Sequence, residues 1–197
     1  MAMAKRKKNR DFLPDKPRSG LLDKLYVTKK QRQTLLRWTL YALVVLACLL
    51  IQDTVMSQVR ILRATTDLVP CAIFLICLLE STESGCLFCM ISAQLFFHAG
   101  SAPGAYVIIL FTFIGLGVSI FRQSYLRQGF AATALCTAAA LLAYELAVMA
   151  ICLATGLTRS GRISVYFTTW LLSLAGIPIL YPICKAIHKI GGETWKE

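Results

Sequence analysis

The chain has 197 residues, of which 57% are hydrophobic and only 16% charged, and its formal net charge is +11. Because about a quarter of the residues of a typical soluble domain are charged, this composition excludes an ordinary soluble protein. The positive charge does not indicate nucleic-acid binding, since twelve of the 21 Lys and Arg residues lie in the first 37 positions, just before the first apolar run. Basic residues placed there set the orientation of a membrane protein and contact anionic lipid.

Residues 1–36 are predicted to form a basic cytoplasmic arm. Met1–Arg18 is rich in Lys and Arg and contains two prolines, which is typical of a disordered tail. From Ser19 to Arg37, apolar residues recur at helical spacing between lysines. This pattern predicts a short interfacial helix with its basic residues at the lipid headgroups. The first apolar run is long and lacks a small-residue cleavage site, so we do not interpret it as a cleaved signal peptide.

Residues 37–190 are predicted to form one all-α membrane domain of six transmembrane helices, followed by a cytoplasmic tail at 191–197. Four apolar runs are long enough to cross a hydrocarbon core of about 30 Å as helices. The runs Asp67–Leu79 and Gly85–Phe97 have 13 residues each, which as helices rise only about 20 Å. With helical flanks both runs just cross, and we favour this over a re-entrant hairpin. The expected spans are about 37–56, 66–82, 84–98, 103–121, 130–155 and 164–187.

The distribution of basic residues predicts that both termini lie in the cytoplasm, because Lys and Arg accumulate on the inner side of a membrane. With this orientation the basic arm shares the inner side with Arg122, Arg127, Lys185, Lys189 and Lys196. The outer side then carries only Arg60, Arg63, Arg159 and Arg162. A chain of four spans with a hairpin at 67–98 would have the same orientation, so charge does not decide between the two topologies.

Glu145 lies near the middle of the apolar run Ala131–Thr155, where an ionisable side chain is costly. Several alanines surround it, and such small residues permit close approach of another helix. Glu145 could bind a substrate or a proton, or it could be hydrogen-bonded to a neighbouring helix and fix the bundle. We favour the structural role, because no other acid lies in the middle of a predicted span.

The other notable polar residues lie near the ends of spans. Gln52 and Asp53 close the first span, and Asp67 is typical of a helix start, where its side-chain oxygen would cap free N–H groups. Gln94 and His98 are four residues apart and therefore share a helix face. The candidate structural or partner-contact residues are Gln52, Asp53, Asp67, Glu80, Gln94, His98 and Glu145.

The sequence contains no catalytic triad, phosphate loop or metal-ligand spacing. All eight cysteines fall in apolar runs, where cysteine behaves as a small hydrophobic residue. Cys86 and Cys89 form a C-x-x-C pair, which elsewhere indicates redox or zinc chemistry, but no second Cys or His pair is near them. We therefore expect a protein that is not an enzyme and has no cofactor or metal, and we rank acid–base catalysis by Glu145 below this.

The order of these features resembles the MreD family, the small integral-membrane rod shape-determining proteins of bacteria. The resemblance spans roughly residues 35–190 and rests on the segments Leu50–Thr54, Thr66–Leu68, Leu79–Glu80 with Gly85, and Ala102–Tyr106. In the family, a glutamine with small polar neighbours is followed by Pro-Asp-Leu and then by a Gly-rich turn before a Leu-Gly step. This chain departs from that pattern at Thr66, where proline is usual, and at Phe96–His98, where many members have an aspartate.

The resemblance implies a non-enzymatic component of the elongation machinery in the bacterial cytoplasmic membrane. Members of the family associate with MreC, and through it with the MreB filament, the RodA glycosyltransferase and its partner transpeptidase, and they support lateral peptidoglycan synthesis and cell shape. The family is also similar to the substrate-binding subunits of energy-coupling-factor vitamin transporters, six-helix proteins with both termini inside. That similarity supports six spans and supplies an alternative function, capture of a vitamin in a pocket with Gln52, Gln94, His98 and Tyr106.

Overall fold

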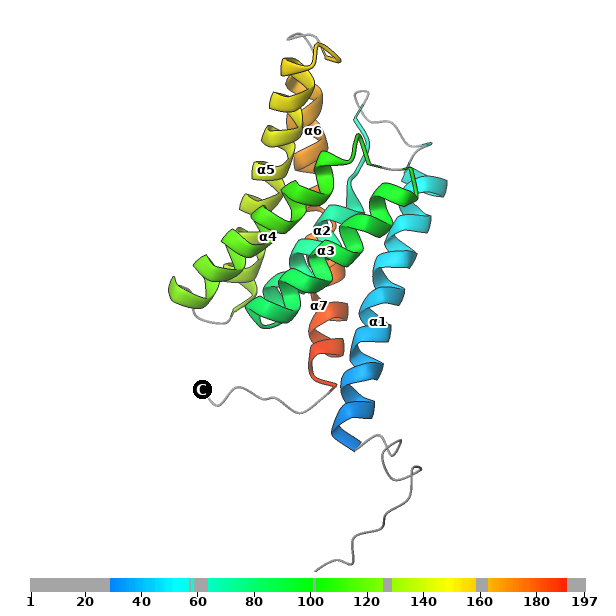
Figure 1. The fold of residues 1–197 in the computed structure, drawn as a ribbon, viewed down its shortest axis with the longest axis vertical. Helices are drawn as coiled ribbons and strands as arrows, with labels where there is room; N and C mark the ends of the chain where they lie inside the picture. The colour runs from blue at the N-terminus through cyan, green and yellow to red at the C-terminus, as the bar shows by residue number, and fades with distance from the viewer. Residues whose placement is uncertain are drawn as a thin grey trace, which may run out of the picture.

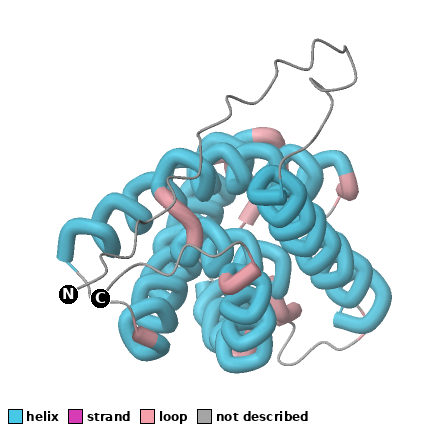
Figure 2. The backbone as a smooth tube through the Cα atoms, turned by 90° about the horizontal axis from the view of Figure 1, so that it is seen from below, coloured by secondary structure: helices cyan, strands magenta, loops and turns pink. Residues whose placement is uncertain are grey.

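The computed structural model describes residues 29–56, 58, 64–100, 102–125, 129–158 and 163–190. Over these residues the fold consists of helices and contains no strand, as Figure 1 and Figure 2 show, so the all-α prediction is confirmed. The elements are α1 (Lys29–Ile51), a π-helical turn η2 (Gln52–Met56), α2 (Leu68–Leu79), α3 (Thr82–His98), α4 (Tyr106–Tyr125), α5 (Phe130–Ala154), α6 (Ile163–Leu174) and α7 (Ile177–His188). The predicted disordered tail and most of the predicted interfacial helix lie outside the described residues.

Among the described residues, two helices are long and apolar enough to cross a membrane. One runs from Gln31 through η2 to Met56, and the other is α5. The pair α6 and α7 meets the same test together but is bent by 47°, so it adds a third crossing if the bent pair acts as one span. Helices α2 and α4 are apolar but shorter. The structure therefore agrees with a membrane protein that has two or three helices able to span the bilayer.

Helix α2 forms the centre of the bundle. Ten consecutive residues, from Val69 to Leu78, are buried, and α2 contacts α1, α3, α4, α5, α6 and α7. A helix that is apolar all round is typical of the core of a large protein or of a membrane span, and here other helices surround it. Its 12 residues rise about 18 Å, less than a hydrocarbon core of about 30 Å. Because its neighbours are helices, the length of α2 does not have to match the thickness of the bilayer.

Two boundaries differ from the sequence-based expectation. Helix α1 includes residues 29–36, which we had assigned to the arm. The predicted span 164–187 is divided into α6 and α7 by a break at Ala175–Gly176. Pro178 lies in the first turn of α7 and has no N–H to donate to the carbonyl of Leu174, four residues earlier, so a straight helix cannot continue through this point.

Glycine allows α3 to approach α2 closely. A Cβ atom added to Gly85 would lie only 2.7 Å from the carbonyl oxygen of Cys77 in α2. Gly115 in α4 is also crowded, with the Sγ atom of Cys89 at 3.0 Å from such a Cβ, whereas Gly117 has nothing within 4 Å. The α2–α3–α4 layer therefore depends on two positions without a side chain.

Replacement of Gly85 by alanine is expected to lower the free energy of unfolding by about 1–3 kcal/mol, because the new methyl group overlaps the Cys77 carbonyl and must separate the two helices. Gly117→Ala is the matched control. It makes the same change inside a helix where space is open, and alanine favours helix over glycine by up to about 1 kcal/mol. Thermal unfolding of both variants in one detergent, followed by circular dichroism, tests this. Equal melting temperatures would contradict the close contact.

Candidate functional site

Two groups of polar side chains lie at opposite ends of α2. Asp67 directly precedes the first residue of α2, and Glu80 directly follows its last. Glu80 is part of the Glu80 cluster, which consists of Arg37, Tyr41, Glu80 and His188. Asp67 and Glu145 of α5 line one cavity, and we call these two residues the acidic pair. The two groups differ in how their carboxyl groups are satisfied.

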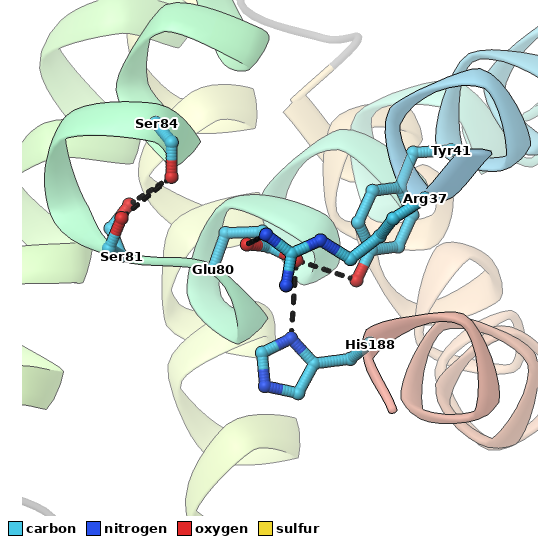
Figure 3. Close-up of polar contacts among 6 residues, drawn as sticks. All are labelled: Arg37, Tyr41, Glu80, Ser81, Ser84 and His188. Carbon is cyan, nitrogen blue, oxygen red and sulfur yellow. Dashed lines mark hydrogen bonds and ion pairs between the residues drawn. The ribbon is translucent and has the colours of Figure 1, made fainter. Parts of the chain in front are cut away.

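In the Glu80 cluster, three side chains converge on one carboxylate, as Figure 3 shows. The Tyr41 hydroxyl donates to Oε1 of Glu80 at 2.9 Å, and Nδ1 of His188 lies 3.2 Å from the same oxygen. Nη2 of Arg37 lies 3.3 Å from Oε2, and the Glu80 side chain is only 3% exposed. A buried carboxylate is tolerated when it is paired and hydrogen-bonded in this way.

The Glu80 cluster joins three helices that are far apart in the sequence. Arg37 and Tyr41 belong to α1, Glu80 ends α2, and His188 is the last residue of α7. The first residue of α1 and the last residue of α7 lie at the same end of the bundle in Figure 1. The cluster therefore holds both ends of the described chain beside the turn between α2 and α3.

The acidic pair has no cationic partner among the described residues. Glu145 is 6% exposed, and it lines the same cavity as Asp67. In the described part of the chain, no N–H or hydroxyl group donates to Oε1 of Glu145. The acidic pair therefore keeps hydrogen-bonding capacity that the protein itself does not use.

A cavity of about 190 Å³ borders the acidic pair. Its walls come from the segments before α2 and α4 and from helices α3, α5 and α6. The lining residues are Thr65, Asp67, Phe96, Pro103, Tyr144, Glu145, Val148, Cys152, Tyr166 and Thr169. The cavity thus combines two carboxyl groups with aromatic rings and hydroxyl groups, and none of its lining residues is Lys, Arg or His.

The prediction that the Asp67 side chain caps α2 is wrong. Asp67 occupies the N-cap position but makes no side-chain cap hydrogen bond, and it lines a cavity together with Glu145. The cap is supplied by Gln52, whose Oε1 accepts the N–H of Val69 at 2.9 Å. The N–H of Asp67 donates to Oγ of Ser173 at 2.9 Å. Gln52 therefore joins η2 to the start of α2, through a contact that the sequence did not indicate.

The remaining candidates lie away from the cavity. Asp53, Gln94 and His98 are exposed, and neither Gln94 nor His98 lines the cavity, although they share a face of α3. Tyr106 comes nearer, with its hydroxyl 3.7 Å from Sγ of the cavity residue Cys152. None of the four residues expected in a vitamin pocket therefore lines the cavity that contains Glu145, although Tyr106 contacts one residue of its lining.

Sequence reasoning missed the partners of Glu80 and the residues that line the cavity with Glu145. No local motif connects Glu80 to Arg37, Tyr41 or His188. In the sequence these three residues looked like ordinary residues of a membrane interface. Tyr166 and Thr169 do have a detectable signal, since they are three apart and thus share a helical face in an apolar run. The cysteines of α2 and α3 pack as expected: Cys89 donates to the carbonyl of Phe111 at 3.1 Å.

Glu80→Gln is expected to destabilise the protein by about 3 kcal/mol, because removing one partner of a buried ion pair leaves the other charge uncompensated. Glu83→Gln is the matched control, since Glu83 is exposed in the first turn of α3. The double variant Arg37→Met, Glu80→Gln should recover part of the loss by removing the unpaired charge. Thermal unfolding in one detergent measures all three. Equal effects of the two Glu→Gln changes would refute the proposed anchoring role of Glu80.

Comparison with known proteins adds no assignment to this geometry. No family model, no curated protein and no solved structure matches the chain. The resemblance to the MreD family therefore rests on the order and identity of the residues quoted from the sequence. In the structure, Thr66–Leu68 lie at the start of α2 and Leu79–Glu80 at its end.

Proposed function

We propose that this chain is a non-enzymatic membrane component of the bacterial elongation machinery, similar to MreD. It crosses the cytoplasmic membrane with six helices, keeps both termini in the cytoplasm, binds MreC and thereby supports lateral peptidoglycan synthesis and rod shape. Through MreC it is connected to MreB, RodA and its partner transpeptidase. The six spans are α1 with η2, α2, α3, α4, α5, and the bent pair α6 and α7.

The proposal is carried by one observation: residues on which the resemblance rests make contacts between helices. Gln52 caps α2, the N–H of Asp67 bonds to α6 through Ser173, Glu80 joins α1 to α7, and Gly85 permits the contact of α3 with α2. Each of these residues fixes a junction between helices. Such a shared set is expected of a family that is related by its fold and acts as a scaffold.

The proposed topology is supported by the shielding of α2 and by the Glu80 cluster. The 12 residues of α2 are too few to match the thickness of the hydrocarbon core. A central helix that other helices surround does not need to match it, so α2 is counted as a span. An even number of crossings agrees with the location of the first residue of α1 and the last of α7 at one end (Figure 1). Lys185 and Lys189 at the end of α7 add positive charge to that end, as the inner side of a membrane requires.

A groove between α1 and the α6–α7 pair offers a surface for a partner helix. It has a volume of about 490 Å³, and its walls are formed almost entirely by apolar side chains. Ala47, Ala175 and Gly176 contribute to it, and small residues of this kind let helix backbones approach each other closely within a membrane. We assign this groove to a membrane-embedded helix of MreC.

Filling the groove should break the proposed complex. Ala175→Trp is expected to reduce the amount of MreC that co-purifies with the tagged chain by about tenfold, equivalent to about 1.4 kcal/mol, and to widen or round the host cells. Ala139→Trp, at an exposed position on α5, makes the same change outside the groove and should leave both readouts unaltered. Both variants are expressed in place of the host's own copy. Failure of the unmodified chain to co-purify with MreC, together with normal cell width after its depletion, would refute the function.

The cavity beside Glu145 is the observation that favours the alternative, a vitamin-binding subunit of an energy-coupling-factor transporter. At about 190 Å³, however, it is smaller than the roughly 300–1,000 Å³ of sites for drug-sized ligands. None of the four residues expected in the vitamin pocket is part of its lining. The scaffold function is therefore the better supported of the two.

A further inference from the structure

The acidic pair stands apart from every other polar group in the described bundle. Two buried side-chain atoms of the described residues lack a hydrogen-bond partner, Nε of Arg37 and Oε1 of Glu145. The first belongs to a guanidinium group that is already paired with Glu80. The second belongs to a residue that lines a cavity. The described residues thus supply one buried carboxylate with three partners and supply no donor to Oε1 of Glu145, which lines a cavity.

The walls of the cavity indicate which chemical group would complete the site. Carboxyl groups accept hydrogen bonds, and the lining provides no cationic side chain to donate them. Aromatic faces attract cations as well, and Phe96, Tyr144 and Tyr166 all contribute to the lining. Tyr144 is held in place by the ring of Phe111, with the two centroids 5.0 Å apart. Carboxyl groups beside fixed aromatic rings are the combination that favours an ammonium group.

The volume of the cavity limits the rest of the ligand. At about 190 Å³ it is slightly larger than the roughly 150 Å³ of an engineered cavity that binds benzene. Val148, Pro103 and Phe96 add apolar surface to the lining. A ligand that fits therefore has one cationic nitrogen and an apolar body of about the size of a benzene ring.

We propose that the cavity formed by Asp67, Glu145 and the surrounding aromatic residues binds a small organic cation, a primary ammonium compound with a compact apolar body. The ammonium N–H groups donate to the acidic pair, and the hydroxyl groups of Thr65 and Thr169 line the same space. This site is separate from the groove assigned to MreC, and its occupancy is independent of the proposed scaffold function.

Benzylammonium is a suitable probe, with benzyl alcohol and benzoate as neutral and anionic ligands of nearly the same shape. With the full chain in lipid nanodiscs at neutral pH, isothermal titration calorimetry should show saturable binding of benzylammonium. The affinity should be at least about tenfold higher than that for benzyl alcohol, as expected for hydrogen bonds between charged groups. Benzoate should not bind. Equal affinity for benzylammonium and benzyl alcohol, or no saturable binding of benzylammonium, would overturn the proposal without any variant being needed.

Variants then locate the site. Glu145→Gln and Asp67→Asn should each weaken benzylammonium binding at least about tenfold, because each removes one carboxyl group from the binding site. Glu83→Gln, which removes an exposed acid elsewhere on α3, should leave the affinity unchanged. Circular dichroism checks that each variant is folded, and a folded Asp67→Asn protein suffices if Glu145→Gln does not fold. Unchanged affinity in a folded Asp67→Asn or Glu145→Gln protein would overturn the proposal. MreC co-purification is measured in parallel, so loss of the ligand site is distinguishable from loss of the scaffold function.

Discussion

The structure depends on satisfying the two ends of a helix that water does not reach. A helix leaves free N–H groups at its start and free carbonyl groups at its end, and α2 is buried along nearly its whole length. At its start, Gln52 accepts the N–H of Val69 and Ser173 accepts that of Asp67. At its end, the N–H of Glu80 bonds to the carbonyl of Ile76, and the Glu80 side chain gathers residues from α1 and α7. The helices around α2 are therefore tied to its ends by polar contacts, and along its length by apolar packing.

The two acids next to α2 serve different purposes because their surroundings differ. Glu80 has a guanidinium, a phenol and an imidazole around it, which together use both of its oxygens. Such a group stabilises one arrangement and leaves nothing for a ligand. The acidic pair has no cationic partner in the described part of the chain, and it borders a cavity. One end of α2 is thus completed by the fold itself, whereas the other end retains unused binding capacity.

Sequence reasoning predicted what depends on composition and local order. The helical class followed from long apolar runs, and α5 at Phe130–Ala154 agrees closely with the expected span of 130–155, since that run is long and follows a glycine. Glu145 was recognised as unusual because an acid in such a run is costly. The position of Asp67 beside the same cavity was not recognised, because Asp67 comes from a distant segment, just before α2. Its spacing in the sequence could suggest only the local role of a helix cap. The contacts of Gln52 with Val69 and of Arg37 with Glu80 likewise depend on helix packing, which no single segment encodes.

The composition of the Glu80 cluster has an evolutionary consequence. Arg37, Tyr41, Glu80 and His188 come from three separate segments, and each contact is useful only while the others persist. Loss of Glu80 would leave the buried guanidinium of Arg37 without its counter-charge. These four positions are therefore expected to be replaced as a set or not at all. Exposed apolar positions such as Leu87 and Phe113 carry no such restriction and only need to remain lipophilic. Among related chains, drift should therefore accumulate on the outer faces of α3 and α4 while the four coupled positions change in concert.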